Sequence, residues 1–239
     1  MSDDLFKTLQ TIKFFSNYNR WLYDQMRPFL KGTVVDVGSG IGNVAYFFED
    51  NAAIEKTVLT DASVTMLSGL HQRFDGKERF EIIPYDISSS PPENLRHMAD
   101  VVTCVNVLEH IEDDRKALRH MAEILKPGGS LILMVPSLMA IYGSLDKLVG
   151  HYRRYTKPMI SRVVDADIYS IEEVKYMNML GVLTWFFSGK ILRMNEFHPE
   201  ACGTLDKLVP LLKKVESGFT PAFGQSLIAV CRKTDSTSG

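Results

Sequence analysis

The stretch VVDVGSGIG, Val34 to Gly42, sets three glycines at every second position directly after a run of β-branched residues. A strand that runs into so open a turn brings main chain close to another group. Dinucleotide-binding turns have the spacing GxGxxG, whereas Gly38, Gly40 and Gly42 give GxGxG, with Asn43 in place of the third glycine. The sequence also contains no GxxxxGK[ST] loop for a nucleoside triphosphate. The turn therefore disfavours both ligands, and a purely structural role for its glycines stays open.

Strand-like runs alternate with helix-like segments around this turn, as is typical of a mostly parallel α/β sheet with helices on both faces. Strands are expected at 33–37, 57–60, 79–84, 100–105, 131–135, 167–177 and 226–232, and helices at 43–50, 63–74, 113–125, 180–192 and 205–215. KPGG, residues 126–129, is expected to separate the third helix from the next strand. We expect a single domain over 1–239, with N-terminal cap helices at 1–30, a cofactor-binding core at 33–135 and substrate-covering insertions at 136–166 and 178–217.

The composition favours a small-molecule partner over nucleic acid, because 27 Lys and Arg are balanced by 29 Asp and Glu. Cys104, Cys202 and Cys231 form no CxxC pair, which argues against a disulfide framework and a structural zinc. The first residues do not resemble a secretory signal, and no apolar run reaches the roughly 18 residues of a membrane span. These features predict a cytoplasmic protein without stable membrane insertion.

Polar residues follow three strands at the edge where open α/β sheets bind ligands. Asp61 ends the second strand, Asp86 follows the third and Asn106 follows the fourth. An acid at the position of Asp61 can accept two hydrogen bonds from a ribose diol. Either aspartate could instead cap a turn or helix, but their register with the glycine turn favours a binding role.

The motifs VVDVGSGIG, TDASVTML, YDI, VNVLEHIEDD and LKPGG, in this order between Thr33 and Val135, resemble the class I S-adenosylmethionine-dependent methyltransferases. The resemblance implies a Rossmann-like sheet of seven strands whose last strand is antiparallel, and S-adenosyl-L-methionine as cofactor. The cofactor-binding residues that it implies are Tyr18, Asp36, Gly38, Ser39, Gly40, Gly42, Asp61, Ala62, Met66, Asp86, Ile87 and Asn106.

The same resemblance implies a role for each group in that set. The glycine turn and Asp36 would hold the methionine part of the cofactor, and Asp61 the ribose hydroxyls. Met66 would lie against the adenine, with Asp86 accepting from its exocyclic amine. Tyr18 would lie near the cofactor's carboxylate, unless it only packs against neighbouring aromatic residues.

Pro136 to Pro158 concentrates hydrogen-bonding side chains after the fifth strand. Methyl transfer chiefly requires alignment, and a hydroxyl acceptor also needs a base tuned near neutral pH, most often His. In a helix over 145–151, Asp146 and His151 would be poor partners unless the helix ends at Gly150. His151 would then start a new turn and could point into the cleft, so we predict it as the catalytic base, with a structural role as the alternative.

The candidates for substrate binding are His110, Tyr142, Arg153 and Arg154. A guanidinium matches a carboxylate or phosphate in two-point fashion, although adjacent arginines also pair with acids of their own chain. His110 could instead cap the acidic helix start that follows it. The GHxRRYT segment is similar to one in bacterial class I methyltransferases of small-molecule and glycan pathways, which identifies no acceptor. The six histidines form no cluster at ligand spacing along the chain, so no metal is predicted.

The apolar segment from Asn178 to Met194 leaves several roles open: a core or lid helix, an acceptor pocket, a dimer surface or a transient membrane contact. We therefore predict a methyltransferase acting on a small-molecule acceptor, at a hydroxyl or carboxylate oxygen, with an amine as the alternative. An NAD-dependent oxidoreductase and a non-catalytic cofactor-binding module remain the rival interpretations.

Overall fold

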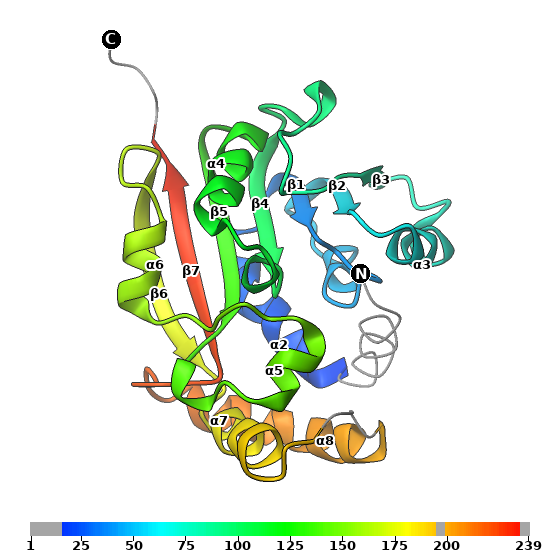
Figure 1. The fold of residues 1–239 in the computed structure, drawn as a ribbon. Helices are drawn as coiled ribbons and strands as arrows, with labels where there is room; N and C mark the ends of the chain where they lie inside the picture. The colour runs from blue at the N-terminus through cyan, green and yellow to red at the C-terminus, as the bar shows by residue number, and fades with distance from the viewer. Residues whose placement is uncertain (1–15, 195–198, 235–239) are drawn as a thin grey trace.

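A seven-stranded sheet organises the computed structural model, which describes residues 16–194 and 199–234 (Figure 1). The strand order is β3-β2-β1-β4-β5-β7-β6. The strands are β1 (Gly32–Val37), β2 (Ile54–Asp61), β3 (Phe80–Pro84), β4 (Ala99–Val105), β5 (Leu125–Pro136), β6 (Tyr169–Met177) and β7 (Ser226–Lys233). β7 runs antiparallel to β5 and β6, and the other pairs are parallel. The predicted fold class, with its antiparallel last strand, is confirmed.

Helices cover both faces of the sheet. The α-helices are α2 (Ser16–Met26), α3 (Val64–Phe74), α4 (Asp114–Ile124), α5 (Ser144–Val149), α6 (Lys157–Val163), α7 (Met179–Trp185) and α8 (Pro199–Glu216). Short 3₁₀ turns are η1 (Arg27–Phe29), η2 (Ala45–Phe48), η3 (Glu93–Leu95), η4 (Leu108–His110) and η5 (Met139–Ile141), and η6 (Phe186–Ile191) is π-helical. Within the described ranges, no helix is long and apolar enough to cross a membrane.

Two hydrophobic clusters form the core because successive residues of a strand point to opposite faces. Val34 of β1 and Ile132 of β5 pack in one cluster with residues of α2 and α3. Their neighbours Val35 and Leu133 pack in the other cluster with residues of α4 and α6. The sheet is therefore buried on both sides, and its ligand-binding edge remains at the ends of the strands.

The segment after the glycine turn differs from the helix predicted at 43–50, because only the 3₁₀ turn η2 forms. Val44, which precedes η2, makes no side-chain capping hydrogen bond. Glu49 and Asp50 follow η2, where negative charge opposes the dipole of a longer helix.

The boundary at KPGG also differs from the prediction. α4 ends at Ile124 and β5 begins at Leu125, which pairs with Ala99. KPGG therefore lies inside an irregular start of β5, opposite a register shift in β4 and with Gly128 at φ 67°. The pairing of buried Leu125 extends the strand past these turn residues.

Two helix boundaries after β5 follow local sequence signals. α5 ends at Gly150, whose φ of 81° is left-handed, and Thr156 caps α6 by accepting from the backbone N–H of Met159. The single helix predicted at 180–192 is instead α7 followed by the π-helical η6.

α8 anchors the N-terminal helix of the described chain. The Asp206 carboxylate accepts from the backbone N–H of Asn17 at 3.0 Å and of Tyr18 at 2.9 Å. An acid at this position satisfies unpaired donors of the first helical turn. Residues 1–15 of the predicted N-terminal cap lie outside the described residues.

Candidate active site

A cavity of about 1080 Å³ lies at the carboxyl ends of the parallel strands. Gly38 follows β1, Asp61 ends β2, Asp86 follows β3 and Asn106 follows β4, and all four line the cavity. β1 and β4 are neighbours at the point where the strand order reverses. Ligands of open α/β sheets bind at this switch point.

The glycine turn forms one wall of the cavity and could not be built from other residues. Gly38, Gly40 and Gly42 have φ values of 68°, 57° and 74°. A Cβ atom on Gly38 would lie 2.5 Å from the side chain of Val107. The turn is also tied to β2, since the Gly40 N–H donates to Asp61 Oδ2 at 2.9 Å. Main chain is thus exposed to the cavity where a side chain would fill it.

Gly42 and Met66 are not brought to the cavity wall. A Cβ atom on Gly42 would lie 2.4 Å from the ring of Phe74, so this glycine permits the packing of α3. Met66 is 1% exposed within α3 and does not line the cavity. Their predicted contacts with a cofactor have no support from this geometry.

Two buried carboxylates stand beside the turn. Thr103 Oγ1 donates to Asp36 Oδ1 at 2.6 Å, and burial nevertheless raises the pKa of Asp36 to about 6. Asp61 Oδ1 accepts from the Ser63 N–H at 2.9 Å, and burial raises the pKa of Asp61 as well. Each carboxylate retains lone pairs for further donors. We call Asp36, Gly38, Gly40 and Asp61 the glycine-turn side of the cavity.

The remaining predicted cofactor residues line the same cavity: Tyr18, Ser39, Ala62, Asp86, Ile87 and Asn106. The Tyr18 hydroxyl lies 3.1 Å from Ser226 Oγ and so is held against β7. Asn106 has a left-handed φ of 53°, and its N–H donates to the Met134 carbonyl at 2.8 Å.

His151 also lines the cavity, from the loop that follows α5. Because α5 ends at Gly150, the chain turns back and His151 Nδ1 comes to 2.9 Å from Asp146 Oδ1. Nδ1 therefore carries the hydrogen and donates to Asp146. Tyr142 does not line the cavity, but its hydroxyl donates to the His151 carbonyl at 2.7 Å. The sequence allowed an Asp146–His151 pair only if the helix ends at Gly150, and α5 does end there.

Asp146 joins this loop to three other elements. Besides His151, it accepts from Arg154 Nε at 2.7 Å, Trp185 Nε1 at 3.0 Å and the Gly143 N–H at 2.9 Å. Burial alone would raise the pKa of Asp146, but the hydrogen bond from His151 and the charge of Arg154 lower it below its usual value. Asp146 is therefore a buried carboxylate anion.

The two arginines have different surroundings. Arg154 lines the cavity but is 1% exposed and also donates to the Ser137 carbonyl at 3.0 Å. Arg153 does not line the cavity and donates to Asp114 Oδ2 at 3.0 Å and to the carbonyls of Ile111 and Glu112. Arg153 therefore matches the alternative in which it pairs with its own chain, and the charge of Arg154 is already balanced.

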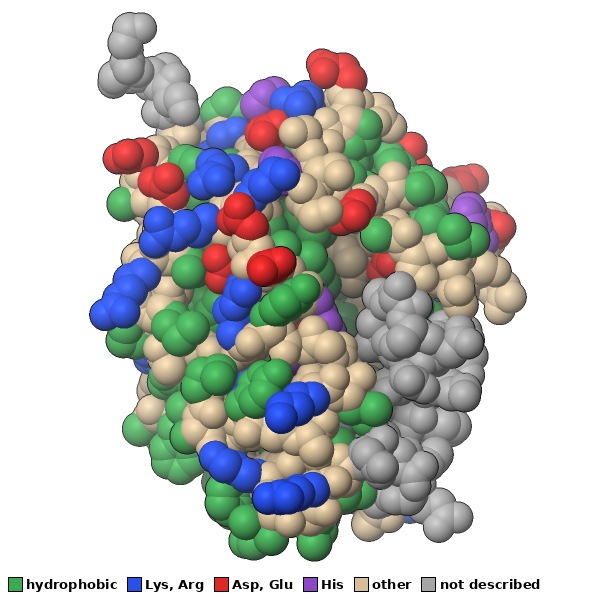
Figure 2. Space-filling model, in the orientation of Figure 1, with side chains coloured by type: hydrophobic (Ala, Val, Ile, Leu, Met, Phe, Trp, Pro, Cys, Tyr) green, Lys and Arg blue, Asp and Glu red, His purple; other side chains and the backbone are tan. Residues whose placement is uncertain are grey.

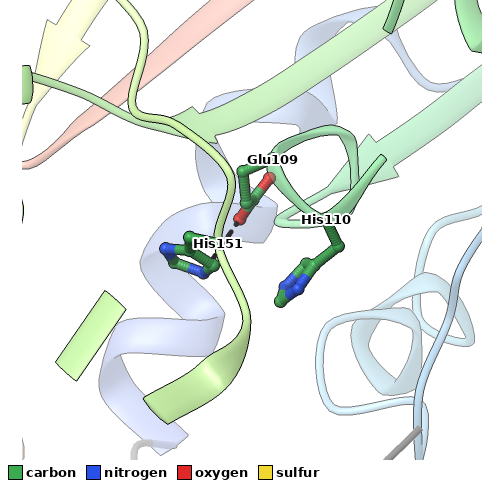
Figure 3. Close-up of side chains that lie close together, drawn as sticks. All are labelled: Glu109, His110 and His151. Atoms are coloured by element: carbon green, nitrogen blue, oxygen red, sulfur yellow. Dashed lines mark ion pairs between the residues drawn. The ribbon is translucent and has the colours of Figure 1, made fainter. Parts of the chain in front are cut away.

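Glu109, which the sequence analysis did not single out, joins His110 and His151 in a cluster that lines the cavity (Figure 3). Glu109 Oε1 lies 3.7 Å from His151 Nε2, and the His110 and His151 rings meet edge to face at 4.8 Å. Burial raises the pKa of Glu109 to about 7. Burial and the charge of His151 together lower the pKa of His110 to about 4. We call Glu109, His110, Asp146, His151 and Arg154 the His151 side.

Spacing along the chain could not reveal this cluster, because Glu109 and His110 belong to η4 and His151 to a loop beyond β5. The available signal was the carboxylate of Glu109 directly after the apolar Val107 and Leu108, just beyond the end of a strand. The prediction that no metal binds depended on spacing alone.

The family model for the methyltransferase domain matches residues 35–131, which include the end of β1, the glycine turn and β4. Over these residues the chain matches the methyltransferase domain family, in agreement with its resemblance to the class I S-adenosylmethionine-dependent methyltransferases. S-Adenosyl-L-methionine is the cofactor of this family.

Curated relatives of this chain differ in the atom that they methylate. It is 28% identical over 149 residues to a ubiquinone/menaquinone biosynthesis C-methyltransferase of Francisella philomiragia, covering 60% of this chain and 57% of the relative. It is 27% identical over 153 residues to a ubiquinone biosynthesis O-methyltransferase of Thiobacillus denitrificans, covering 58% and 64%. The matches thus span less than two thirds of either relative.

Solved structures share the fold at low sequence identity. A candidate methyltransferase from Bacillus halodurans C-125 has a TM-score of 0.62 at 19% identity, covering 90% of this chain and 98% of that one. The [4+2]-cyclase SpnF has a TM-score of 0.59 at 18% identity, covering 90% and 80%. The architecture alone therefore does not determine the reaction.

The glycine-turn side fits the family's cofactor. An exposed main-chain turn suits a group that must approach closely, and Asp36 and Asp61 can accept from an amino group and from ribose hydroxyls. Asp86 and buried Ile87 continue the wall beyond β3.

Proposed function

We propose that this methyltransferase transfers a methyl group to an oxygen of a small molecule, a hydroxyl or a carboxylate, bound against His151. The observation that carries the proposal is the Asp146–His151 pair, held at 2.9 Å in the wall of the cavity that the glycine turn also lines. When bound, S-adenosyl-L-methionine supplies a methyl carbon on a sulfonium, which the acceptor oxygen attacks in line while the bonding electrons remain on sulfur.

On the glycine-turn side, the proposed roles follow the family resemblance. Asp36 would hold the cofactor's amino group, Asp61 its ribose and Asp86 its adenine amine. The raised pKa values of Asp36 and Asp61 support this assignment, because a buried carboxylate gains from a bound cationic or hydrogen-bond-donating group. Tyr18, Ser39, Ala62, Ile87 and Asn106 would complete this part of the pocket.

On the His151 side, the proposed task is removal of the acceptor's proton. A neutral imidazole with Nδ1–H held by a carboxylate presents Nε2 as the basic atom. Asp146 would keep the ring in this tautomer and stabilise its protonated form. A carboxylate acceptor is already ionised and would need only the alignment that the pocket provides.

The acceptor is proposed to carry an apolar portion. Leu180 and Leu183 of α7, with Leu208 and Leu212 of α8, line the cavity. Figure 2 shows hydrophobic side chains at the end of the molecule where α7 and α8 lie, and Leu180 and Leu183 are 47% and 53% exposed. Residues that face both the cavity and the surface suit a hydrocarbon group entering from outside. The curated relatives, which by name act in ubiquinone biosynthesis, are consistent with such an acceptor.

The first experiment is calorimetric titration of the protein with S-adenosylmethionine, S-adenosylhomocysteine and NAD. We expect saturable binding of the two sulfur compounds only. Binding of NAD alone would overturn the cofactor assignment. Phenols and hydroxy acids with and without alkyl chains are then screened for S-adenosylhomocysteine release.

The role of His151 is tested with the best acceptor from this screen. His151→Ala should lower turnover at least about a hundredfold with unchanged S-adenosylhomocysteine affinity. The matched control is His71→Ala, because His71 is exposed and pairs with Asp75 away from the cavity. Normal turnover in His151→Ala would remove this residue from the reaction.

A further inference from the structure

We infer that Glu109, His110 and His151 form a binding site for one divalent transition-metal cation, which holds the oxygen of the acceptor. This inference rests on the proposed methyl transfer to an oxygen, and it makes His151 a metal ligand in place of the base proposed above. It assigns the cluster a ligand and selects acceptors whose oxygen can coordinate a metal.

The donor set and its geometry fit such a cation. One ligand atom from each of the three side chains lies within 4.8 Å of the other two. Around a cation with bonds of about 2.1 Å, ligand atoms lie roughly 3–4 Å apart, so small side-chain rotations close the site. Two imidazole nitrogens and one carboxylate oxygen suit zinc, cobalt or iron(II), and leave further coordination positions open for an acceptor.

Glu109 supplies an observation independent of this proximity. Its side chain is 0% exposed, and within the described part of the chain neither carboxylate oxygen has a hydrogen-bond partner. His151 Nε2 lies 3.7 Å from Glu109 Oε1, which is too far for a hydrogen bond. A buried carboxylate without partners is costly, and a bound cation would remove that cost.

The surrounding contacts orient the three ligands. Asp146 accepts from His151 Nδ1, which directs Nε2 towards Glu109. His110 is hydrogen-bonded to the backbone of Gly150, and the Tyr152 N–H donates to the Glu109 carbonyl at 2.8 Å. Metal-binding histidines commonly have their second nitrogen fixed in this way by a carboxylate or carbonyl.

The cation would change how the acceptor loses its proton. A coordinated hydroxyl ionises at lower pH than a free one, so its proton passes to solvent and its oxygen remains on the metal as an anion. A lone pair of that oxygen then forms the bond to the methyl carbon as the carbon–sulfur bond breaks. In this form of the enzyme His151 Nε2 is a ligand, and the proton does not go to the ring.

The test is titration of chelator-treated protein with Co²⁺, followed by visible absorption and by metal analysis after gel filtration. We expect one equivalent of Co²⁺, and competition by Zn²⁺. Glu109→Gln, His110→Ala and His151→Ala should each weaken binding by at least about a hundredfold, more than changes to residues that only hold a ligand side chain in place. His71→Ala should bind as the unaltered protein does.

Two results would overturn the inference: no stoichiometric Co²⁺ binding, or binding that all three variants retain. Glu109→Gln keeps the shape of the side chain and removes its charge, so thermal unfolding of this variant shows whether lost binding reflects lost folding. S-Adenosylhomocysteine titration of the same samples separates the two proposals. If it binds and Co²⁺ does not, the metal site fails alone, and if it does not bind, the proposed function fails.

Discussion

On the glycine-turn side, the carboxylates that line the cavity accept hydrogen bonds from main-chain N–H groups and a threonine hydroxyl, whereas on the His151 side Asp146 pairs with charged side chains. The Gly40 N–H donates to Asp61 at the end of the neighbouring strand. Asp146, by contrast, joins His151, Arg154 and the Trp185 ring of α7. Single substitutions of charged residues should therefore lower the stability of the protein less on the glycine-turn side than on the His151 side.

The largest effect is expected for Asp146→Ala, which leaves Arg154 buried without its partner. Breaking a buried ion pair in this way costs about 3–5 kcal/mol of unfolding free energy, which urea denaturation measures. Lys56→Ala, in the exposed pair of Lys56 and Glu81, is the control and should cost at most about 1 kcal/mol. A similar loss for both variants would contradict the stabilising role of the buried Asp146–Arg154 pair.

Glu109→Gln should change how stability depends on pH in chelator-treated protein. The pKa of Glu109 is raised from 4.5 to about 7, so between these values the folded state holds a proton that the unfolded state has lost. Stability should therefore fall as pH rises through this window, by up to about 3 kcal/mol, and this fall should be absent in Glu109→Gln.

Other charged groups face Glu109: His110, His151, Arg154 and Asp146. The lowered pKa of His110 gives the opposite slope, with stability lost as pH falls from 6.5 towards about 4. The measured quantity is therefore the difference in unfolding free energy between the unaltered protein and Glu109→Gln, from pH 4.5 to 8. Parallel curves would mean that Glu109 is not a buried titrating group.

Asp61→Ala should weaken S-adenosylhomocysteine binding by roughly ten- to a hundredfold, since hydrogen bonds to a charged group contribute about 1.5–3 kcal/mol. Calorimetry measures this affinity. Asp75→Ala removes an exposed acid outside the cavity and should leave it unchanged. Unchanged affinity in Asp61→Ala would remove the ribose assignment.

The smallest effect is expected for Gly42→Ala, which tests whether steric crowding or backbone strain limits this position of the glycine turn. Gly42→Ala and Gly76→Ala both place a side chain at positive φ, but only the Gly42 Cβ meets a neighbour, the Phe74 ring. Gly42→Ala should therefore lose about 1–2 kcal/mol more than Gly76→Ala in thermal unfolding. Equal losses would show that the turn at Gly42 is limited by φ alone.

Much of the fold was predictable because it depends on neighbours in the chain. The alternation of strands and helices, the left-handed Gly150 and the Thr156 cap are local patterns that the sequence carries. The helix expected at 43–50 failed for a local reason as well, since nothing caps its start and acids follow it. The boundary predicted at KPGG was wrong because Leu125, which precedes it, already pairs with Ala99 of β4.

By itself, the sequence determined the sheet, the glycine turn and the acids at the strand ends, because φ restrictions and strand periodicity act over a few residues. Only the tertiary structure decided that Met66 is buried away from the cavity and that Arg153 pairs with Asp114. It also brought Glu109 to His151 and Asp146 to Arg154. These contacts join segments that meet only when the sheet assembles, and burial then decides which charges pair and which titrate.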